Sequence, residues 1–228
     1  MIPVLYVWKT STRSLPWVLV QMAINPFQFR RFPGVTFAKS LGTGRGVSFT
    51  PTDADLNQWA ALLVFSDEDS AANFYKSKLV KKWNRHSSEQ LRVTLQPLSS
   101  HGLWAKSKPF GEPTPSKWEG KVAAITRARI KWWMNFQFWR AVPPVTRDLH
   151  SQSGLLAAIG IGEAPIGLQG TFSIWRDGAA LRTFAYEGSA HKTAIAKTAE
   201  LNWYSEELFA RFGVREISGT LNGVDFAN

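Results

Sequence analysis

The chain has 228 residues, 44% of them hydrophobic, with 27 Lys and Arg against 17 Asp and Glu for a formal net charge of +10. It has no cysteine, which excludes disulfides, iron–sulfur clusters, thiolate-ligated haem and cysteine-based zinc sites. The basic charge favours nucleic acid, anionic lipid or an acidic ligand without choosing among them, and an aromatic share of 13% is typical of either a bulky core or a wide apolar cavity.

The first half of the chain predicts the order strand, helix, strand, strand, helix, strand. Pro3–Lys9 is a short apolar strand, and residues 15–31 have helical spacing with a break expected near Pro26. A strand then ends in the glycine turn "LGTGRG", and the apolar strand "QWAALLVF" leads to Asp67 and a helix. The segment "QLRVTLQPL" closes this half as a strand.

The second half predicts the same order after a linker. The segment "KSKPFGEPTPSKWE" at 106–119 is rich in Pro, Lys, Ser and Gly, which is typical of a linker. Residues 121–130 then predict a strand, and 132–142 predict a helix that stops at Pro143–Pro144. A strand ending in the turn "GIGEAP", the strand "QGTFSIW", a helix beginning at Asp177 and the strand "LFARFGVREISG" complete the pattern.

Two pairs of segments match in the same order, which indicates an internal duplication. "LLVFSDEDSAANF" matches "TFSIWRDGAALRTF", and "GVTFAKSLGTG" matches "GLLAAIGIGEA"; in the first pair Asp67 or Asp177 follows a strand and caps a helix. We therefore expect an α+β protein of two fused ferredoxin-like (βαββαβ) repeats, 1-105 and 120-228, joined by the linker 106-119. The two antiparallel sheets would face each other, as in a dimeric α/β barrel, around a cavity lined with aromatic residues.

The glycine turns resemble pieces of phosphate-binding loops, but neither matches G-x-x-x-x-G-K-[ST] or opens a helix after a parallel strand. This disfavours nucleotide binding. Arg45 and Glu163 lie in the two turns and are expected to be solvated charges rather than ligand contacts. The chain also lacks the G-x-S-x-G and H-E-x-x-H motifs of hydrolases and zinc proteases.

The four histidines, His86, His101, His150 and His191, lie far apart in the sequence, which disfavours non-haem iron and zinc sites. Haem needs only one protein ligand, and a neutral imidazole can supply it. His191 follows the small residues 188–190, which would let a macrocycle approach. We expect His86 at a helix end, His101 exposed and His150 in a loop. The residues alone leave His191 as either a haem ligand or a polar residue at a helix start.

Six long segments resemble the spheroidene monooxygenase family of carotenoid biosynthesis, and together they cover most of the chain in order. They are "FRRFPGVTFAKSLGTGRGVSFTP", "LQPLSSHGLWAKSKPF", "VAAITRARI", "FWRAVPPV", "GIGEAPIGLQGTFSIW" and "AHKTAI…WYSEELFARF". The resemblance is more specific than any single motif in the chain. The segment "RIKWWMNFQFW" is more aromatic than the family pattern, which bears on the identity of the carotenoid.

The resemblance implies a haem-dependent monooxygenase that uses haem b, O₂ and an external electron donor. It would introduce a keto group at C-2 of acyclic carotenoids by successive hydroxylations. It further implies that His191 is the axial ligand to the haem iron, that Arg127 in "TRA" is a catalytic residue and contacts a propionate or the oxygen side, and that Arg140 in "FWR" is a weaker catalytic candidate.

The implied partners are a carotenoid substrate and a redox partner such as ferredoxin, with no nucleic acid. The implied location is cytoplasmic, with peripheral contact at the inner membrane. One alternative is another haem enzyme of the same fold, a dehydratase or peroxidase acting on a small substrate. The other is a tandem RRM-like RNA-binding protein, although "QGTFSIW" lacks the leading basic residue and the aromatic spacing of an RNP1 strand.

Overall fold

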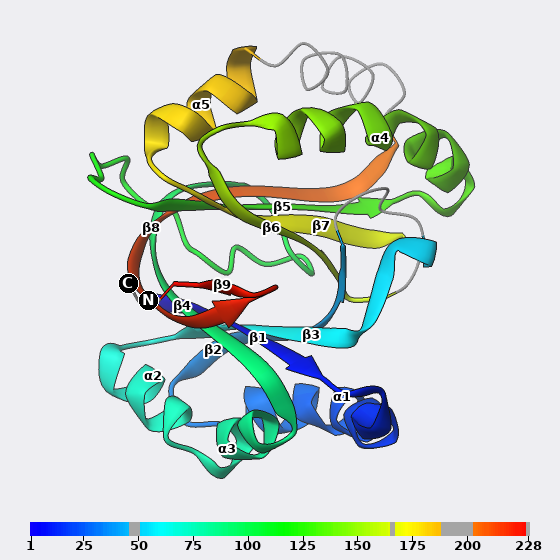
Figure 1. Cartoon of the computed structure of the whole chain (residues 1–228). Helices are drawn as coiled ribbons and strands as arrows, with labels where there is room; N and C mark the ends of the chain where they lie inside the picture. The colour runs from blue at the N-terminus through cyan, green and yellow to red at the C-terminus, as the bar shows by residue number, and fades with distance from the viewer. Residues whose placement is uncertain (46–50, 165–166, 188–202, 227–228) are drawn as a thin grey trace. The chain divides into compact units, whose positions relative to one another are not determined.

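The structure is a computed structural model, and it forms two compact units that are interleaved along the chain (Figure 1). The residues it describes are 1–45, 51–164, 167–187 and 203–226. Unit 1 comprises Met1–Thr43, Asp55–Gln96 and Val214–Asn228, and unit 2 comprises Gly44–Ala54 and Pro97–Gly213.

Unit 1 has a sheet with the strand order β4-β1-β3-β2, in which β1 pairs antiparallel with both β3 and β4. Its strands are β1 (Ile2–Thr10), β2 (Val35–Gly44), β3 (Ala54–Phe65) and the first part of β4 (Ser87–Gly102). The chain ends in a short hairpin of β8 with β9 (Val224–Asp225), which sequence patterns did not predict.

Three helices cover one face of the unit 1 sheet (Figure 1). They are α1 (Leu15–Arg30), which follows the 3₁₀ turn η1 (Thr12–Ser14), α2 (Glu68–Tyr75) and α3 (Lys78–Arg85). The predicted second helix is therefore two helices, because Ser77 accepts a hydrogen bond from the Val80 N–H and begins α3. Large aromatic side chains fill the space between helices and sheet: the Trp8 ring stacks on Trp83 at 4.8 Å and on Tyr6 at 5.4 Å.

Unit 2 has a sheet with the strand order β6-β7-β5-β8, and its described pairings are antiparallel. Its strands are β5 (Val122–Ile130), β6 (Leu155–Gly162), β7 (Leu168–Trp175) and the first part of β8 (Tyr204–Leu221). The 3₁₀ turn η3 (Trp132–Met134) leads into α4 (Asn135–Ser151), and α5 (Gly178–Glu187) follows β7. Both helices lie on one face of this sheet (Figure 1).

The predicted order of strands and helices is confirmed in both units, and the elements repeat in detail. β1 and β5 each span nine residues and end in a bulge against the last strand of the unit. Asp67 accepts a hydrogen bond from the Ser70 N–H at 2.7 Å, and Asp177 accepts one from the Ala180 N–H at 2.8 Å. Asp67 and Asp177 therefore cap the N-termini of α2 and α5 in the same way, as predicted from the sequence.

Two helices continue through the prolines at which breaks were expected, so those predictions are wrong. α1 runs past Pro26, and α4 runs past Pro143 and Pro144 to Ser151, which places His150 in a helix rather than a loop. Proline removes one hydrogen-bond donor but keeps a φ angle that a helix accepts. Buried residues beyond the prolines, Phe29 in α1 and Leu149 in α4, hold the later turns against their sheets.

The boundaries of the compact units differ from those of the predicted repeats. The strands β4 and β8 are long, and each contributes residues to both units, where the two strands pair with each other. Each pairing has a glycine with positive φ at a point where the backbones nearly touch. A Cβ on Gly219 would lie 1.9 Å from the Gln90 carbonyl oxygen in unit 1, and one on Gly102 would lie 2.1 Å from that of Glu207 in unit 2. Glycine is therefore required at both points.

The predicted linker has no helix or strand apart from a bridge between Trp104 and Ser107, but it is packed against unit 2. Phe110 is buried with its ring 4.8 Å from that of Phe212. Trp118 packs against the hydrophobic cluster of unit 2. The division into 1-105 and 120-228 stays a prediction about the duplicated segments.

Candidate functional site

The central strand of unit 2, β5, presents two very different faces. Val122 and Ala124 pack with Leu149 of α4 and Leu181 of α5, so this face points to the helices. Because side chains alternate along a strand, Thr126 and Ala128 share that face, and Arg127 belongs to the other one.

The helix-facing side of β5 carries short side chains where unit 1 has large ones. At the matching positions of β1, Tyr6 and Trp8 are each 2% exposed and fill the helix layer. In β5 the corresponding residues are Thr126, which is half-buried, and Ala128. Their neighbours on β7 and β6 are also short. We call this surface the small-residue floor, and it comprises Ala124, Thr126, Ala128, Gly160, Thr171 and Ser173.

Two polar groups at the end of this floor near Ala128 have buried atoms that lack a partner among the described residues. Gln169 pairs with Ala128 across the sheet, and its Oε1 accepts no hydrogen bond. Asn135, at the start of α4, donates from Nδ2 to the Trp132 carbonyl at 2.9 Å, but its Oδ1 has no donor. Buried acceptors usually have partners, so both oxygens are available to water or a ligand.

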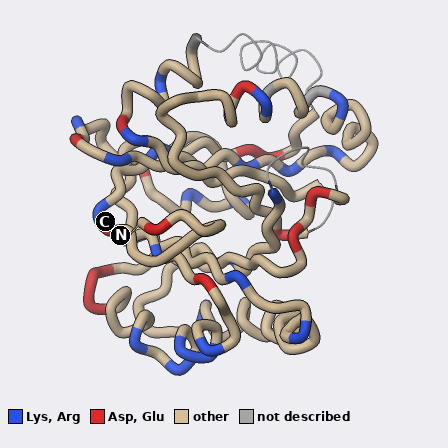
Figure 2. The backbone as a smooth tube through the Cα atoms, viewed as in Figure 1, with Lys and Arg blue, Asp and Glu red and all other residues tan. Residues whose placement is uncertain are grey.

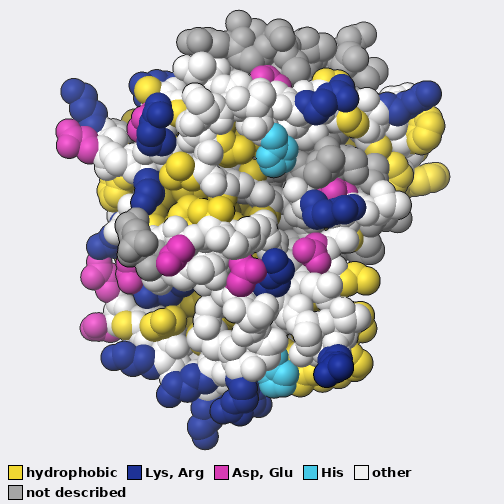
Figure 3. All heavy atoms as spheres, viewed as in Figure 1, with side chains coloured by type: hydrophobic (Ala, Val, Ile, Leu, Met, Phe, Trp, Pro, Cys, Tyr) yellow, Lys and Arg dark blue, Asp and Glu magenta, His cyan; other side chains and the backbone are white. Residues whose placement is uncertain are grey.

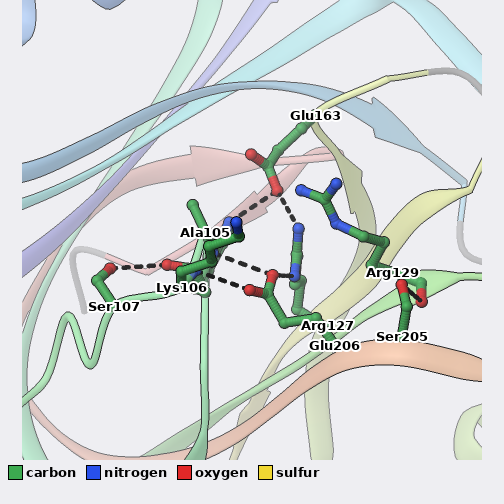
Figure 4. Close-up of polar contacts among 9 residues, drawn as sticks. Ala105, Lys106, Ser107, Arg127, Arg129, Glu163, Ser205 and Glu206 are labelled. Carbon is green, nitrogen blue, oxygen red and sulfur yellow. Dashed lines mark hydrogen bonds and ion pairs between the residues drawn. The ribbon is translucent and has the colours of Figure 1, made fainter.

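The other face of β5 holds a buried charged cluster built around Arg127, whose side chain is 2% exposed (Figure 4). Its Nη2 donates to Glu163 Oε1 at 2.7 Å, and its Nη1 donates to Glu206 Oε1. The indole of Trp104 lies beside the guanidinium, 5.6 Å from ring centroid to Cζ, and donates to the same Glu163 oxygen at 2.8 Å.

Glu206 is fixed by the backbone as well as by Arg127. The N–H groups of Ala105 and Lys106 donate to its two oxygens at 3.0 and 2.7 Å, and both residues have positive φ, 53° and 60°. Burial would raise the pKa of Glu206, but the hydrogen bonds from Lys106, Arg127 and Ala105 and the charge of Arg127 outweigh it and lower that pKa. Glu206 is therefore held as a carboxylate.

This cluster corrects one expectation and leaves another as a prediction. Glu163 was expected to be a solvated turn charge, but its side chain is 14% exposed and paired, so that prediction is wrong. Arg127 already faces two carboxylates, which satisfy both of its terminal nitrogens. Its predicted role toward a propionate or oxygen stays a prediction, since the described contacts assign it to the cluster alone.

A pocket of about 490 Å³ opens beside the cluster in unit 2. Its lining includes Lys106, Arg129 and Glu207, all exposed, together with Ser205 and a face of Glu206. Its wall carries charges of both signs beside the apolar surface of Leu103. Arg129 lies next to the cluster in Figure 4.

The remaining predicted site residues lie apart from this cluster. Arg140 is exposed on α4, with its guanidinium 4.9 Å from the centre of the Phe136 ring. His86 ends α3, stacks on Trp17 at 3.8 Å and contacts the Lys82 carbonyl at 2.9 Å, as expected for a helix end. His101 is exposed in β4, as predicted.

His191, the proposed haem ligand, lies outside the described residues. Among the residues that are described, no group of three or more His, Asp or Glu side chains is placed to hold a metal ion.

Sequence reasoning missed Trp104, Glu206 and the small-residue floor. The floor had a signal in the sequence: aligning the first strand of each repeat sets Tyr6 and Trp8 against Thr126 and Ala128. The roles of Trp104 and Glu206 had none, because Trp104 contacts Glu163, 59 residues along the chain, and Glu206 contacts Ala105, 101 residues away.

Curated relatives extend over nearly the whole chain. The spheroidene monooxygenase of Rhodobacter capsulatus is 38% identical over 221 residues, covering 94% of this chain and 90% of that protein. That of Rubrivivax gelatinosus is 37% identical over 193 residues, covering 84% and 73%. No family model matches the chain.

Solved structures show which fold the chain shares. An aldoxime dehydratase in complex with butyraldoxime aligns with a TM-score of 0.61 at 9% identity, covering 93% of this chain and 79% of that one. At this identity the likeness concerns the fold alone, whereas the curated relatives share the sequence itself along most of its length. The chain belongs to the spheroidene monooxygenase family.

Proposed function

We propose that this protein is a haem-dependent monooxygenase that introduces a keto group at C-2 of an acyclic carotenoid. The observation that carries the proposal is the 38% identity to a spheroidene monooxygenase over 94% of the chain. Each unit, in this proposal, is a ferredoxin-like repeat. The antiparallel strand orders of both sheets and the fold shared with aldoxime dehydratase support that proposal.

The haem would lie in the helix layer of unit 2, over the small-residue floor. A flat macrocycle needs space that side chains do not fill, and Thr126 and Ala128 stand where unit 1 has Tyr6 and Trp8. The cluster of Val122, Leu149, Trp175 and Leu181 closes one end of this layer with apolar side chains. The described residues therefore fit the group, and His191 would hold its iron.

When bound, haem supplies the activation of O₂ that oxidation of a C–H bond requires. Each hydroxylation inserts one oxygen atom of O₂ at C-2, and the other leaves as water with two electrons and two protons from an external donor such as a ferredoxin. A second hydroxylation of the same carbon gives a geminal diol, which loses water to form the ketone.

The contribution of the protein in this proposal is binding, orientation and exclusion of water. The His191 imidazole would bind the iron, and the floor would let the macrocycle approach the strands. The apolar cluster of the helix layer keeps water from one end. The catalytic roles of Arg127 and Arg140 stay predictions; Arg127 lies on the face of β5 opposite the small-residue floor and is held by Glu163 and Glu206.

RNA binding has no support from the sheets. RRM domains bind RNA on the sheet face opposite their helices, which must be open to solvent. Among the described strands, β7 lacks the leading basic residue and the aromatic spacing of an RNP1 strand.

The test replaces floor residues with the large residues of unit 1. In Thr126→Tyr and Ala128→Trp, added rings would occupy the proposed site, so we expect loss of the Soret band on haemin titration while circular dichroism is unchanged. Arg129→Trp places an indole ring on the other face of β5 and should keep the band.

Two histidine variants and a product assay complete the test. His191→Ala should lose the band, and His150→Ala, an exposed helical residue, should keep it. Undiminished haem binding in both floor variants would contradict the proposed site. Absence of a keto-carotenoid when the loaded protein receives reductant and O₂ would contradict the activity.

A further inference from the structure

Helix α1 is apolar on the side that faces away from its own sheet. Leu19, Val20, Ile24 and Phe27 are 54%, 56%, 39% and 65% exposed. Their spacing places them on one helical face, continued by the exposed Pro16 and Ala23. A surface helix normally turns its apolar face to the core and its polar face to solvent. In α1, by contrast, the face toward the sheet includes the buried polar residues Gln21 and Asn25.

The charged residues in α1 and directly beside it along the chain are all basic. Arg13 precedes the helix, Arg30 ends it and Arg31 follows, and all three are exposed without an ion-pair partner among the described residues. The first acidic residue of the chain is Asp53, and six Lys and Arg precede it. Figure 2 shows basic but no acidic residues along α1.

We infer that this face of α1, flanked by Arg13, Arg30 and Arg31, docks the protein on a bilayer containing anionic phospholipid. A contiguous patch of exposed apolar side chains marks an interaction surface. Binding to a bilayer surface grows with the apolar area that is buried in it and with the attraction of basic side chains to anionic phosphates. Figure 3 shows hydrophobic and basic side chains together over α1, at the lower right.

A second copy of the chain fits this surface less well. Two α1 helices packed antiparallel through the same face would bring Arg13 of one close to Arg30 and Arg31 of the other. Like charges at such a contact are destabilising, whereas lipid phosphates would neutralise them. No described helix is long and apolar enough to cross a bilayer, so this docking is a surface contact.

The link to the substrate rests on the proposed function: a carotenoid is dissolved in the bilayer, and docking brings the enzyme to it. The surface itself rests only on α1. Flotation of the purified full chain with vesicles therefore tests it without haem or turnover.

The experiment compares vesicles of phosphatidylglycerol and phosphatidylcholine with vesicles of phosphatidylcholine alone. We expect the wild-type chain to float with the anionic vesicles and to be released by high salt. Val20→Asp combined with Phe27→Asp, and separately Arg30→Glu combined with Arg31→Glu, should each lower the partition about tenfold or more. These residues are exposed, so the variants should keep the wild-type circular dichroism.

The matched control is Leu56→Asp in β3, because Leu56 has the same 56% exposure as Val20 but lies off α1. It should float like the wild type. Trp132 and Trp133, 80% and 61% exposed at η3, form the rival apolar surface. Loss of flotation in Trp132→Asp with Trp133→Asp, but not in the α1 variants, would overturn the proposal.

Two further outcomes decide between lipid and protein. A wild-type dimer that Val20→Asp with Phe27→Asp turns into a monomer, with no vesicle binding, would assign the surface to a second copy and overturn the proposal. Flotation that depends on α1 supports the proposal whether or not the chain oxidises carotenoid, and failure of turnover alone removes only the proposed function.

Discussion

Arg127 is a buried cation whose effect on stability depends on two carboxylates. Glu163 and Glu206 are 14% and 10% exposed, so they too have lost most of their water. Removing one member of such a group leaves uncompensated buried charge, whereas replacing all members with neutral groups of similar size costs much less.

We therefore predict that Arg127→Met lowers the free energy of unfolding by about 3–5 kcal/mol at neutral pH. Adding Glu163→Gln and Glu206→Gln should recover much of the loss, as urea denaturation would measure. The cluster lowers the pKa of Glu206 in the folded state, so its stabilisation is present above the ordinary glutamate pKa and is lost as the pH falls. The cost of Arg127→Met should accordingly shrink in acid. An equal cost at acidic and neutral pH would contradict this account.

At this scale the sequence identified some residues correctly but not their surroundings. The acidic caps Asp67 and Asp177 were predictable because each bonds to a backbone N–H three residues along. Glu163 was not, because its partners Arg127 and Trp104 come from segments distant in the sequence.

Among the elements, β4 and β8 depend on close backbone contact. Gly219 has φ of 97°, and an added Cβ would lie 1.9 Å from the Gln90 carbonyl oxygen. Gly223 has a similar φ of 79°, with no atom within 4 Å of an added Cβ. A substitution at Gly223 therefore measures the free-energy cost of the backbone conformation alone. A substitution at Gly219 measures that cost together with the cost of the steric contact.

Gly219→Ala should lower the thermal midpoint more than Gly223→Ala does. In both variants the left-handed conformation lowers the free energy of unfolding by about 1–2 kcal/mol. In Gly219→Ala the added methyl group must also push two strands apart. Differential scanning calorimetry of the two variants measures the difference. Equal shifts would mean that the strands separate at Gly219 without cost.

The helices illustrate how packing overrides local rules. A proline disfavours the helix interior, which is why breaks were expected at Pro26 and Pro143. The helices continue because their later turns bury Phe29 and Leu149. The sequence contains these residues, but their burial becomes visible only once the sheets have formed beneath them.

Considering the whole molecule, unit 1 needs the end of the chain. Residues Val214–Asn228 belong to it, with Arg215 bonded to Glu68, and the Gly223 N–H donating to Glu89 at 3.0 Å. The first 105 residues therefore do not contain all of unit 1.

A chain that ends at Gly213 should lose stability chiefly in unit 1. Truncation exposes the edge of β4 and removes the β8–β9 hairpin. Hydrogen exchange measured by mass spectrometry should show faster exchange in β1 and β4 than in β5 and β7. Uniform protection equal to that of the intact chain would contradict the division into these units.

The sequence by itself determined the order of strands and helices, the helix caps and the family, because each rests on local patterns or on matches along the chain, and it predicted the duplication. Only the tertiary structure decided which residues meet. It gathered Trp104, Arg127, Glu163 and Glu206 into one buried cluster and left the outer face of α1 exposed. It also showed that Val214–Asn228 belong to unit 1. Such contacts depend on strand pairing and burial between distant segments, which no local pattern encodes.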